Sequence, residues 1–182
     1  MNTMSNIILI GSMGAGKTTN GKWLAKQLGK TFIDLDSLIE MNTGSSISLI
    51  FELEGEAGFR KRESSALAEV LATNNQVIAT GGGAILSAEN RALMQQRGIV
   101  VFLNIPPEMQ LQRLMKDTKR PLMQTEDRAL RLQQLAKERT SLYLECADLQ
   151  LDLSTLPVSK IRHTLLSLIT TYQPCTDIVC PT

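Results

Sequence analysis

The sequence has few of the features that would place it in a membrane, outside the cell or on nucleic acid. Its 182 residues include three cysteines, one histidine and 4% aromatic residues. No apolar run approaches the roughly 20 residues that span a bilayer. The first residues lack the basic and apolar segments of a signal peptide. We therefore expect a cytoplasmic protein with no membrane partner.

Charge and cysteine content exclude further classes. Lys and Arg number 19 against 18 Asp and Glu, a formal net charge of +1, so the basic surplus typical of nucleic-acid-binding proteins is missing. Cys175 and Cys180 do not have zinc-ligand spacing, and His163 falls within an expected helix without a neighbouring nucleophile. The length indicates one domain, residues 1–172, followed by a tail at 173–182. We expect free thiols, no nucleic-acid partner and a monomer.

One stretch carries a specific signal. Residues 11–18 read Gly-Ser-Met-Gly-Ala-Gly-Lys-Thr, which fits the phosphate-loop pattern G-x-x-x-x-G-K-[ST] and directly follows the apolar run 7–10. The glycines let successive N–H groups point inward around an anion, and the helix expected from Lys17 adds its positive dipole end. We expect Lys17 to reach the β- and γ-phosphates and the Thr18 hydroxyl to bind Mg²⁺. The alternative is an ordinary glycine-rich turn.

Strand and helix patterns alternate along the chain. Short apolar runs, typical of strands buried on both faces of a parallel sheet, alternate with segments of helical periodicity. This order predicts a doubly wound α/β fold with a mainly parallel sheet. The expected strands are 7–10, 31–34, 77–80, 99–103 and 149–153, and the expected helices are 17–28, 37–72 (interrupted near 42–44 and 55–58), 87–97, 108–115, 128–146 and 158–172.

Two expected strands end in residues suited to binding, and ligands of open α/β sheets lie at such ends. Asp34 and Asp36 should face the same way if both lie in a strand or its extension. One can then support Mg²⁺ and the other can bind and help to deprotonate a hydroxyl. Both acids could instead cap a helix that starts near Ser37. The glycines at 81–83 would let a ligand approach the backbone, or would simply form a flexible turn.

The arginines are individually uninformative. Arg60 lies in the run Arg-Lys-Arg-Glu at residues 60–63, which ordinarily forms a solvated helix face. Arg139 lies in a long expected helix, and Arg120 lies in the polar stretch 116–127. An arginine that closes over transferring phosphate would stabilise the charge that develops there.

Taken together, these segments resemble the shikimate kinases over about residues 6–169. The aspartates, the arginine motif and the triple glycine in this order are far more specific than the phosphate loop alone. The matching segments are Gly-Ser-Met-Gly-Ala-Gly-Lys-Thr-Thr at 11–19, Phe-Ile-Asp-Leu-Asp at 32–36, Gly-Phe-Arg-Lys-Arg-Glu at 58–63, the glycines at 81–83, Arg-Pro-Leu at 120–122, and Arg139 with Tyr143.

The resemblance implies transfer of the γ-phosphoryl group of ATP to the 3-hydroxyl of shikimate, in the biosynthesis of chorismate and the aromatic amino acids. It implies a three-layer, five-stranded parallel sheet of the nucleoside-monophosphate-kinase type. The moving parts would be substrate-binding helices, about 37–62, and a lid, about 116–127. Mg²⁺ is the implied cofactor and ATP the co-substrate.

The resemblance also assigns roles to residues. Asp36 is the candidate base and binds shikimate hydroxyls, Asp34 and Thr18 serve Mg²⁺, and Glu63 orients Arg60. Implied shikimate-binding residues are Asp36, Arg60, Gly82 and Arg139, the implied catalytic residues are Lys17, Asp36 and Arg120, and those implied to bind ATP are Gly14, Ala15, Gly16, Lys17, Thr18, Thr19, Arg113 and Arg120.

Three other functions are weighed against this one. A kinase of the same architecture for another small hydroxy acid, such as gluconate, would also need a phosphate loop and a carboxylate clamp. A regulatory GTPase is disfavoured because the Asn-Lys-x-Asp motif that reads guanine is missing. A non-catalytic nucleotide-binding module is disfavoured because Lys17, Thr18, Asp34, Asp36 and Arg120 are all intact.

Overall fold

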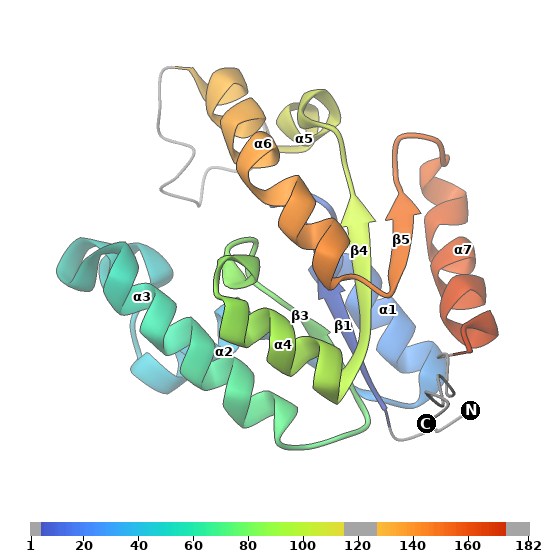
Figure 1. The fold of residues 1–182 in the computed structure, drawn as a ribbon, viewed down its shortest axis with the longest axis horizontal. Helices are drawn as coiled ribbons and strands as arrows, with labels where there is room; N and C mark the ends of the chain where they lie inside the picture. The colour runs from blue at the N-terminus through green and yellow to red at the C-terminus, as the bar shows by residue number, and fades with distance from the viewer. Residues whose placement is uncertain (1–4, 115–126, 174–182) are drawn as a thin grey trace, which may run out of the picture.

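The computed structural model describes residues 5–114 and 127–173 of the chain (Figure 1). In this part of the chain, strands and helices alternate as the sequence predicts. The strands are β1 (Asn6–Ile10), β2 (Thr31–Asp34), β3 (Gln76–Ala79), β4 (Gly98–Asn104) and β5 (Leu149–Asp152); the helices are α1 (Lys17–Leu28), α2 (Leu35–Thr43), α3 (Ile47–Leu71), α4 (Ala88–Arg97), α5 (Pro107–Leu114), α6 (Arg128–Cys146) and α7 (Val158–Thr171), with a 3₁₀ turn, η1 (Ala84–Leu86).

The strands form one parallel sheet in the order β2-β3-β1-β4-β5. β1 lies in the centre, where Ile8 pairs with Ile78 of β3 and with Val100 of β4. Every residue of β1 is buried, as its unbroken apolar run predicts. The predicted α/β class with a five-stranded parallel sheet is confirmed. Because all strands run the same way, the phosphate loop, Asp34 and the glycines at 81–83 lie at the same end of the sheet, where the strands finish.

The sheet separates two apolar layers. Ile8 and Ile10 point into the first layer, which α3, α4 and α6 cover, and these three helices lie on the same side of the sheet in Figure 1. Ile7 and Leu9 point into the second layer, which α1 and α7 cover. Two residues in a row along a strand thus serve opposite cores, and β1 is held rigidly from both sides.

The helix ends bear out one expectation and correct another. Ser87 caps α4 by accepting a hydrogen bond from the N–H of Asn90, as expected. The helix expected near Ser37 instead begins at Leu35, so Asp36 lies in the first turn of α2 rather than in an extension of β2. Asp36 therefore does not extend the strand, and the alternative, in which an acid caps the helix, is confirmed for Asp34. A carboxylate at 34 is a good helix cap, and the cap ends the strand.

The two interruptions expected in the long helical segment have different structures. Gly44 ends α2 in the left-handed conformation and so separates it from α3. Gly55 instead lies inside α3 with φ 69° and ψ −176°, which kinks the helix without ending it. Glycine adopts this conformation readily because it has no Cβ. The kink divides α3 into residues 47–54 and 56–71.

Some expectations fall on residues that the structure does not describe. The expected lid at 116–127, with Arg120, lies almost wholly outside the described residues, as does the tail from residue 174 with Cys175 and Cys180. Among the described residues, no helix is both long enough and apolar enough to cross a membrane.

Candidate active site

The phosphate loop connects β1 to α1 and has the conformation that its glycines predict. Gly11, Gly14 and Gly16 all have positive φ, at 139°, 79° and 85°. A Cβ on Gly11 would also lie 2.6 Å from the carbonyl oxygen of Leu103, so a side chain is excluded there twice. The Lys17 ammonium donates to the carbonyl oxygens of Gly11 (2.6 Å) and Ser12 (3.0 Å). The lysine therefore lies folded over the loop, where bound phosphate would contact it.

Thr18 and Asp34 come together beside this loop, although they lie on different elements. The Thr18 hydroxyl donates to Oδ2 of Asp34 at 2.6 Å, and Oδ1 of Asp34 accepts from the N–H of Ser37 at 3.3 Å. The arrangement places two hard oxygen ligands next to each other, which is the donor set that Mg²⁺ prefers. Asp34 is thus both the helix cap and a possible metal ligand, and the two interpretations of the sequence do not exclude each other.

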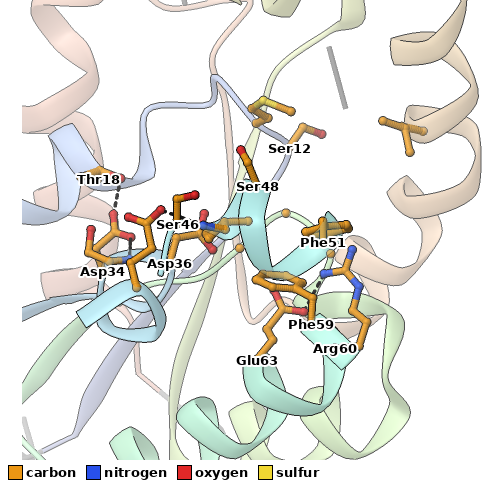
Figure 2. Close-up of a pocket in the computed structure, with 18 of the residues that line it drawn as sticks. Ser12, Thr18, Asp34, Asp36, Ser46, Ser48, Phe51, Phe59, Arg60 and Glu63 are labelled. Atoms are coloured by element: carbon orange, nitrogen blue, oxygen red, sulfur yellow. Dashed lines mark hydrogen bonds and ion pairs between the residues drawn. The ribbon is translucent and has the colours of Figure 1, made fainter. Parts of the chain in front are cut away.

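A pocket of about 630 Å³ lies next to Thr18 and Asp34. Figure 2 shows Asp34 and Asp36 on one side of it and Phe51, Phe59 and Arg60 on the other. The volume suits a small molecule. The lining residues are Ser12, Met13, Thr18, Asp34, Asp36, Ser37, Glu40, Ser46, Ile47, Ser48, Phe51, Phe59, Arg60, Glu63, Gly81, Gly82, Gly83, Gln110, Leu135 and Arg139.

Arg60 lies in this pocket between two carboxylates of its own helix. Its guanidinium donates to Glu63 at 2.7 Å and to Glu56 at 3.0 Å, and it lies 5.3 Å from the centre of the Phe59 ring. Burial lowers the pKa of Arg60, but the carboxylates of Glu63 and Glu56 outweigh that effect and leave the pKa above its usual value. The expectation that Glu63 orients Arg60 is confirmed in its geometry.

Glu63 is a buried carboxylate, with only 1% of its surface exposed. Burial raises the pKa of Glu63, Asp36 adds to the rise, and Arg60 and Arg139 oppose it. Within the pocket, Glu63 therefore interacts electrostatically with the carboxylate of Asp36 and with the guanidinium groups of Arg60 and Arg139. The charges of Asp36, Arg60 and Arg139 thus act on the same buried carboxyl group of Glu63.

The glycines at 81–83 have a tighter role than the sequence suggests. A Cβ on Gly81 would collide with Glu63 and one on Gly83 would collide with the guanidinium of Arg60, whereas a Cβ on Gly82 would meet nothing closer than 3.5 Å. Two of the three glycines thus make room for side chains of the pocket. Gly82 is the one of the three that is partly exposed.

Arg139 reaches the same pocket from α6. It donates to the carbonyl oxygen of Gly82 at 3.3 Å, and the Tyr143 hydroxyl donates to the same oxygen at 2.6 Å. Asp36, Arg60, Gly82 and Arg139, the four residues that the sequence assigned to the acceptor, all line this one pocket.

The remaining predicted residues lie in or beside the phosphate loop, or outside the described part of the chain. Ala15 is buried in the loop and Thr19 is exposed on α1. Arg113 donates to the carbonyl oxygen of Gly14 at 3.2 Å, so it lies against the phosphate loop from α5. Arg120 lies outside the described residues.

The structure adds three residues in or beside the pocket to which the sequence assigned no role. Glu56 was findable from its i, i+4 spacing to Arg60. Phe51 packs on Phe59 with ring centres 4.7 Å apart, a contact across the kink that no sequence period reports. Tyr143 was visible in the motif with Arg139, but only the structure brings its hydroxyl to Gly82.

Unpartnered polar atoms concentrate in this pocket. Among the described residues, the buried side-chain nitrogen and oxygen atoms without a hydrogen-bond partner are Nε of Arg60, Nε of Arg139 and Oε1 of Glu63. All three residues line the pocket. Buried polar groups are rarely left unpaired, so this clustering marks a site built for a polar molecule.

Comparison with known proteins decides between the families that share this architecture. The family model described as shikimate kinase matches residues 13–170. The chain belongs to the shikimate kinase family. Among curated family members, the shikimate kinase of Nitrosococcus oceani is 48% identical over 168 residues, covering 92% of this chain and 88% of that protein. That of Francisella tularensis subsp. novicida is 52% identical over 157 residues, covering 86% and 89%.

Solved shikimate kinase structures agree. The enzyme from Acinetobacter baumannii, solved in complex with shikimate, superposes with a TM-score of 0.88 at 47% identity, covering 92% of this chain and 94% of that one. A gluconokinase from Sinorhizobium meliloti, at 16% identity and a TM-score of 0.56 over 91% of each chain, shares the fold alone.

Proposed function

We propose that this chain transfers the γ-phosphoryl group of ATP to the 3-hydroxyl of shikimate, giving shikimate 3-phosphate and ADP. The observation that carries the proposal is the pocket beside the phosphate loop, in which an acid, Asp36, faces two guanidinium groups with unpartnered nitrogens. Shikimate is a small cyclic acid with several hydroxyls, and the Acinetobacter baumannii relative was solved with it bound. The acid group of shikimate would suit the guanidinium groups, and its hydroxyls would suit the carboxylate of Asp36.

The acceptor carboxylate is the group that the guanidinium groups of Arg60 and Arg139 would bind. A planar donor pairs with a planar carboxylate through two parallel hydrogen bonds. The Nε atoms of both arginines are buried and unpartnered, and a carboxylate in this position would pair with them. The ring hydroxyls would then lie toward Asp36 and the backbone of Gly82.

The donor phosphates would lie in the loop of residues 11–18, held by its backbone N–H groups and by Lys17. Thr18 and Asp34 would hold Mg²⁺, directly or through its waters, and the ion would neutralise charge on the β- and γ-phosphates. Arg113, which already contacts Gly14, lies where it can contact the nucleotide.

The reaction forms a bond between the γ-phosphorus and the acceptor oxygen and breaks the bond from that phosphorus to the bridging oxygen of ADP. The proton of the acceptor hydroxyl passes to Asp36, which lies in the first turn of α2 and faces the pocket. Phosphoryl transfer makes small demands on a base, so orientation of the hydroxyl is the larger part of this residue's role.

A coupled assay of ADP release tests the proposal. Purified protein with Mg·ATP is given shikimate, gluconate or a nucleoside monophosphate in parallel. We expect acceleration by shikimate alone. Acceleration by gluconate would favour the alternative kinase, and ATP binding without turnover on any acceptor would favour a nucleotide-binding module. The monomeric state and the cytoplasmic location stay predictions from the sequence, and the first is checked by light scattering.

A further inference from the structure

A buried tyrosine lies between the phosphate loop and the acceptor pocket. Tyr143 on α6 is 1% exposed, and its hydroxyl donates to the carbonyl oxygen of Gly82 at 2.6 Å. Arg139, one helical turn earlier, donates to the same oxygen at 3.3 Å. Tyr143 and Arg139 thus donate to the same carbonyl oxygen, and a shift of that oxygen would shift both side chains.

The other side of Tyr143 faces the donor. The Ser12 side chain in the phosphate loop interacts with the tyrosine hydroxyl. A Cβ placed on Gly82 would lie 3.5 Å from the N–H nitrogen of Met13 and 3.6 Å from the carbonyl oxygen of Gly11. Gly82 therefore lies directly against the backbone of the phosphate loop, with the Tyr143 hydroxyl at the junction.

The ring of Tyr143 is fixed as well as its hydroxyl. It stacks on Phe102 with ring centres 4.9 Å apart and an angle of 16°. Phe102 on β4 pairs in register with Ile10, the residue before the phosphate loop. The tyrosine is thus anchored on the strand that flanks the loop. Burial raises the pKa of Tyr143 to about 12, so its hydroxyl keeps the proton that it donates to Gly82.

We propose that Tyr143 is a positioning residue for the phosphoryl transfer. Its hydroxyl holds the Gly82 carbonyl, and through that oxygen the Arg139 guanidinium, at a fixed place relative to the phosphate loop. The acceptor is thereby bound in register with the donor phosphates. Tyr143 does not line the pocket and acts through Gly82 and Arg139. The inference rests on the proposed function.

The variant Tyr143→Phe tests this role because it removes the hydroxyl and keeps the ring on Phe102. We expect the KM for shikimate to rise about tenfold, in line with loss of one buried hydrogen bond. We expect the KM for ATP to change by less than about twofold, because the backbone and Lys17 hold the phosphates independently. Both constants are measured in the ADP-release assay, with a thermal unfolding curve of each protein.

The chain offers a matched control in its other tyrosine, since there are two in the sequence. The Tyr172 hydroxyl donates to Asp148 at 3.4 Å. Asp148 directly precedes β5, at the end of the sheet opposite the pocket. Tyr172→Phe should leave both KM values unchanged.

An unchanged KM for shikimate in Tyr143→Phe would overturn the positioning role, as would a lower Tm with both KM values raised equally, which indicates a structural role only. If wild type itself shows no response to shikimate, the proposed function fails and this inference with it.

A second measurement does not depend on how the variant folds. In hydrogen exchange on the wild-type protein, shikimate should protect the segments 81–83 and 140–146 together. Protection confined to 81–83 would overturn the link through Tyr143.

Discussion

The phosphate loop and the acceptor pocket lie at the same end of the sheet, but one is formed by consecutive residues and the other by residues from several elements. The loop consists of eight consecutive residues, and its shape follows from the positive φ of Gly11, Gly14 and Gly16. The pocket draws residues from α2, α3, the segment after β3 and α6. The loop binds through backbone groups, whereas the pocket relies on charged side chains that orient one another.

The two regions should therefore respond differently to substitutions. A backbone cradle tolerates changes at distant positions, because its geometry is local. A network such as that of Arg60, Glu63 and Arg139 depends on each member and on the glycines that make room for it. Changes that separate donor binding from acceptor binding test the comparison directly.

The largest effect is expected from Lys17→Met on the donor side. Loss of the ammonium should lower kcat about a thousandfold, because it removes a positive donor from the transferring phosphate. Shikimate binding, measured by isothermal titration, should stay within about twofold of wild type. Lys26→Met, in the exposed last turn of the same helix, is the control. Loss of shikimate binding in Lys17→Met would show that the two regions are not separate.

Arg60→Ala is the counterpart on the acceptor side. It should raise the KM for shikimate about a hundredfold, because it removes a carboxylate partner and leaves Glu63 buried without its ion pair. The KM for ATP should change little. Lys61→Ala, an exposed neighbour on α3, should behave as wild type. An unchanged KM for shikimate in Arg60→Ala would contradict the assignment of the carboxylate site.

Gly83→Ala tests whether the pocket needs its glycines for space. Gly83 has φ −102°, which alanine adopts without strain, so only the collision of the new Cβ with the Arg60 guanidinium matters. Displacement of that group should raise the KM for shikimate about tenfold. A thermal unfolding curve of Gly83→Ala, beside that of wild type, controls for a general loss of stability. Crystals of Gly83→Ala with an unmoved Arg60 would refute this explanation.

Glu63 should make the stability of the protein depend on pH. Its pKa is raised in the folded state, so the protonated acid stabilises the fold. That contribution is complete below the ordinary carboxyl pKa of 4.5 and is lost as pH rises through the higher folded value. Glu63→Gln should therefore reduce the decline in free energy of unfolding above pH 4.5, measured by urea titration. Parallel pH profiles for the two proteins would contradict the raised pKa.

The smallest effect is expected from Arg62→Ala. Arg62 forms two hydrogen bonds with Glu54, at 2.6 and 2.9 Å, across the kink at Gly55. The pair connects the half of α3 that carries Phe51 to the half that carries Arg60. Because both side chains are more than one third exposed, the KM for shikimate should rise only about twofold. High salt should screen this ion pair and so raise the wild-type KM for shikimate to that of the variant.

The two regions also differed in how far the sequence predicted them. The strands and the phosphate loop were predicted nearly to the residue, because apolar runs and glycine spacing are local signals. Asp36 was placed in the right pocket for a wrong reason, since α2 begins at Leu35 and turns the side chain there. The glycines at 81–83 line the pocket as expected, and the structure adds that Gly81 and Gly83 leave room for Glu63 and Arg60.

Sequence patterns alone predict the parallel α/β architecture and the donor loop, and the motifs carry the resemblance to shikimate kinases. The architecture and the loop follow from periodicity and residue spacing, which are local signals, whereas the resemblance rests on the quoted motifs. Only the tertiary structure brings Arg60 and Arg139 to one pocket, gathers the unpartnered polar atoms there, and places the Tyr143 hydroxyl between the two substrate regions. These depend on contacts between distant segments, which packing creates and no local pattern records.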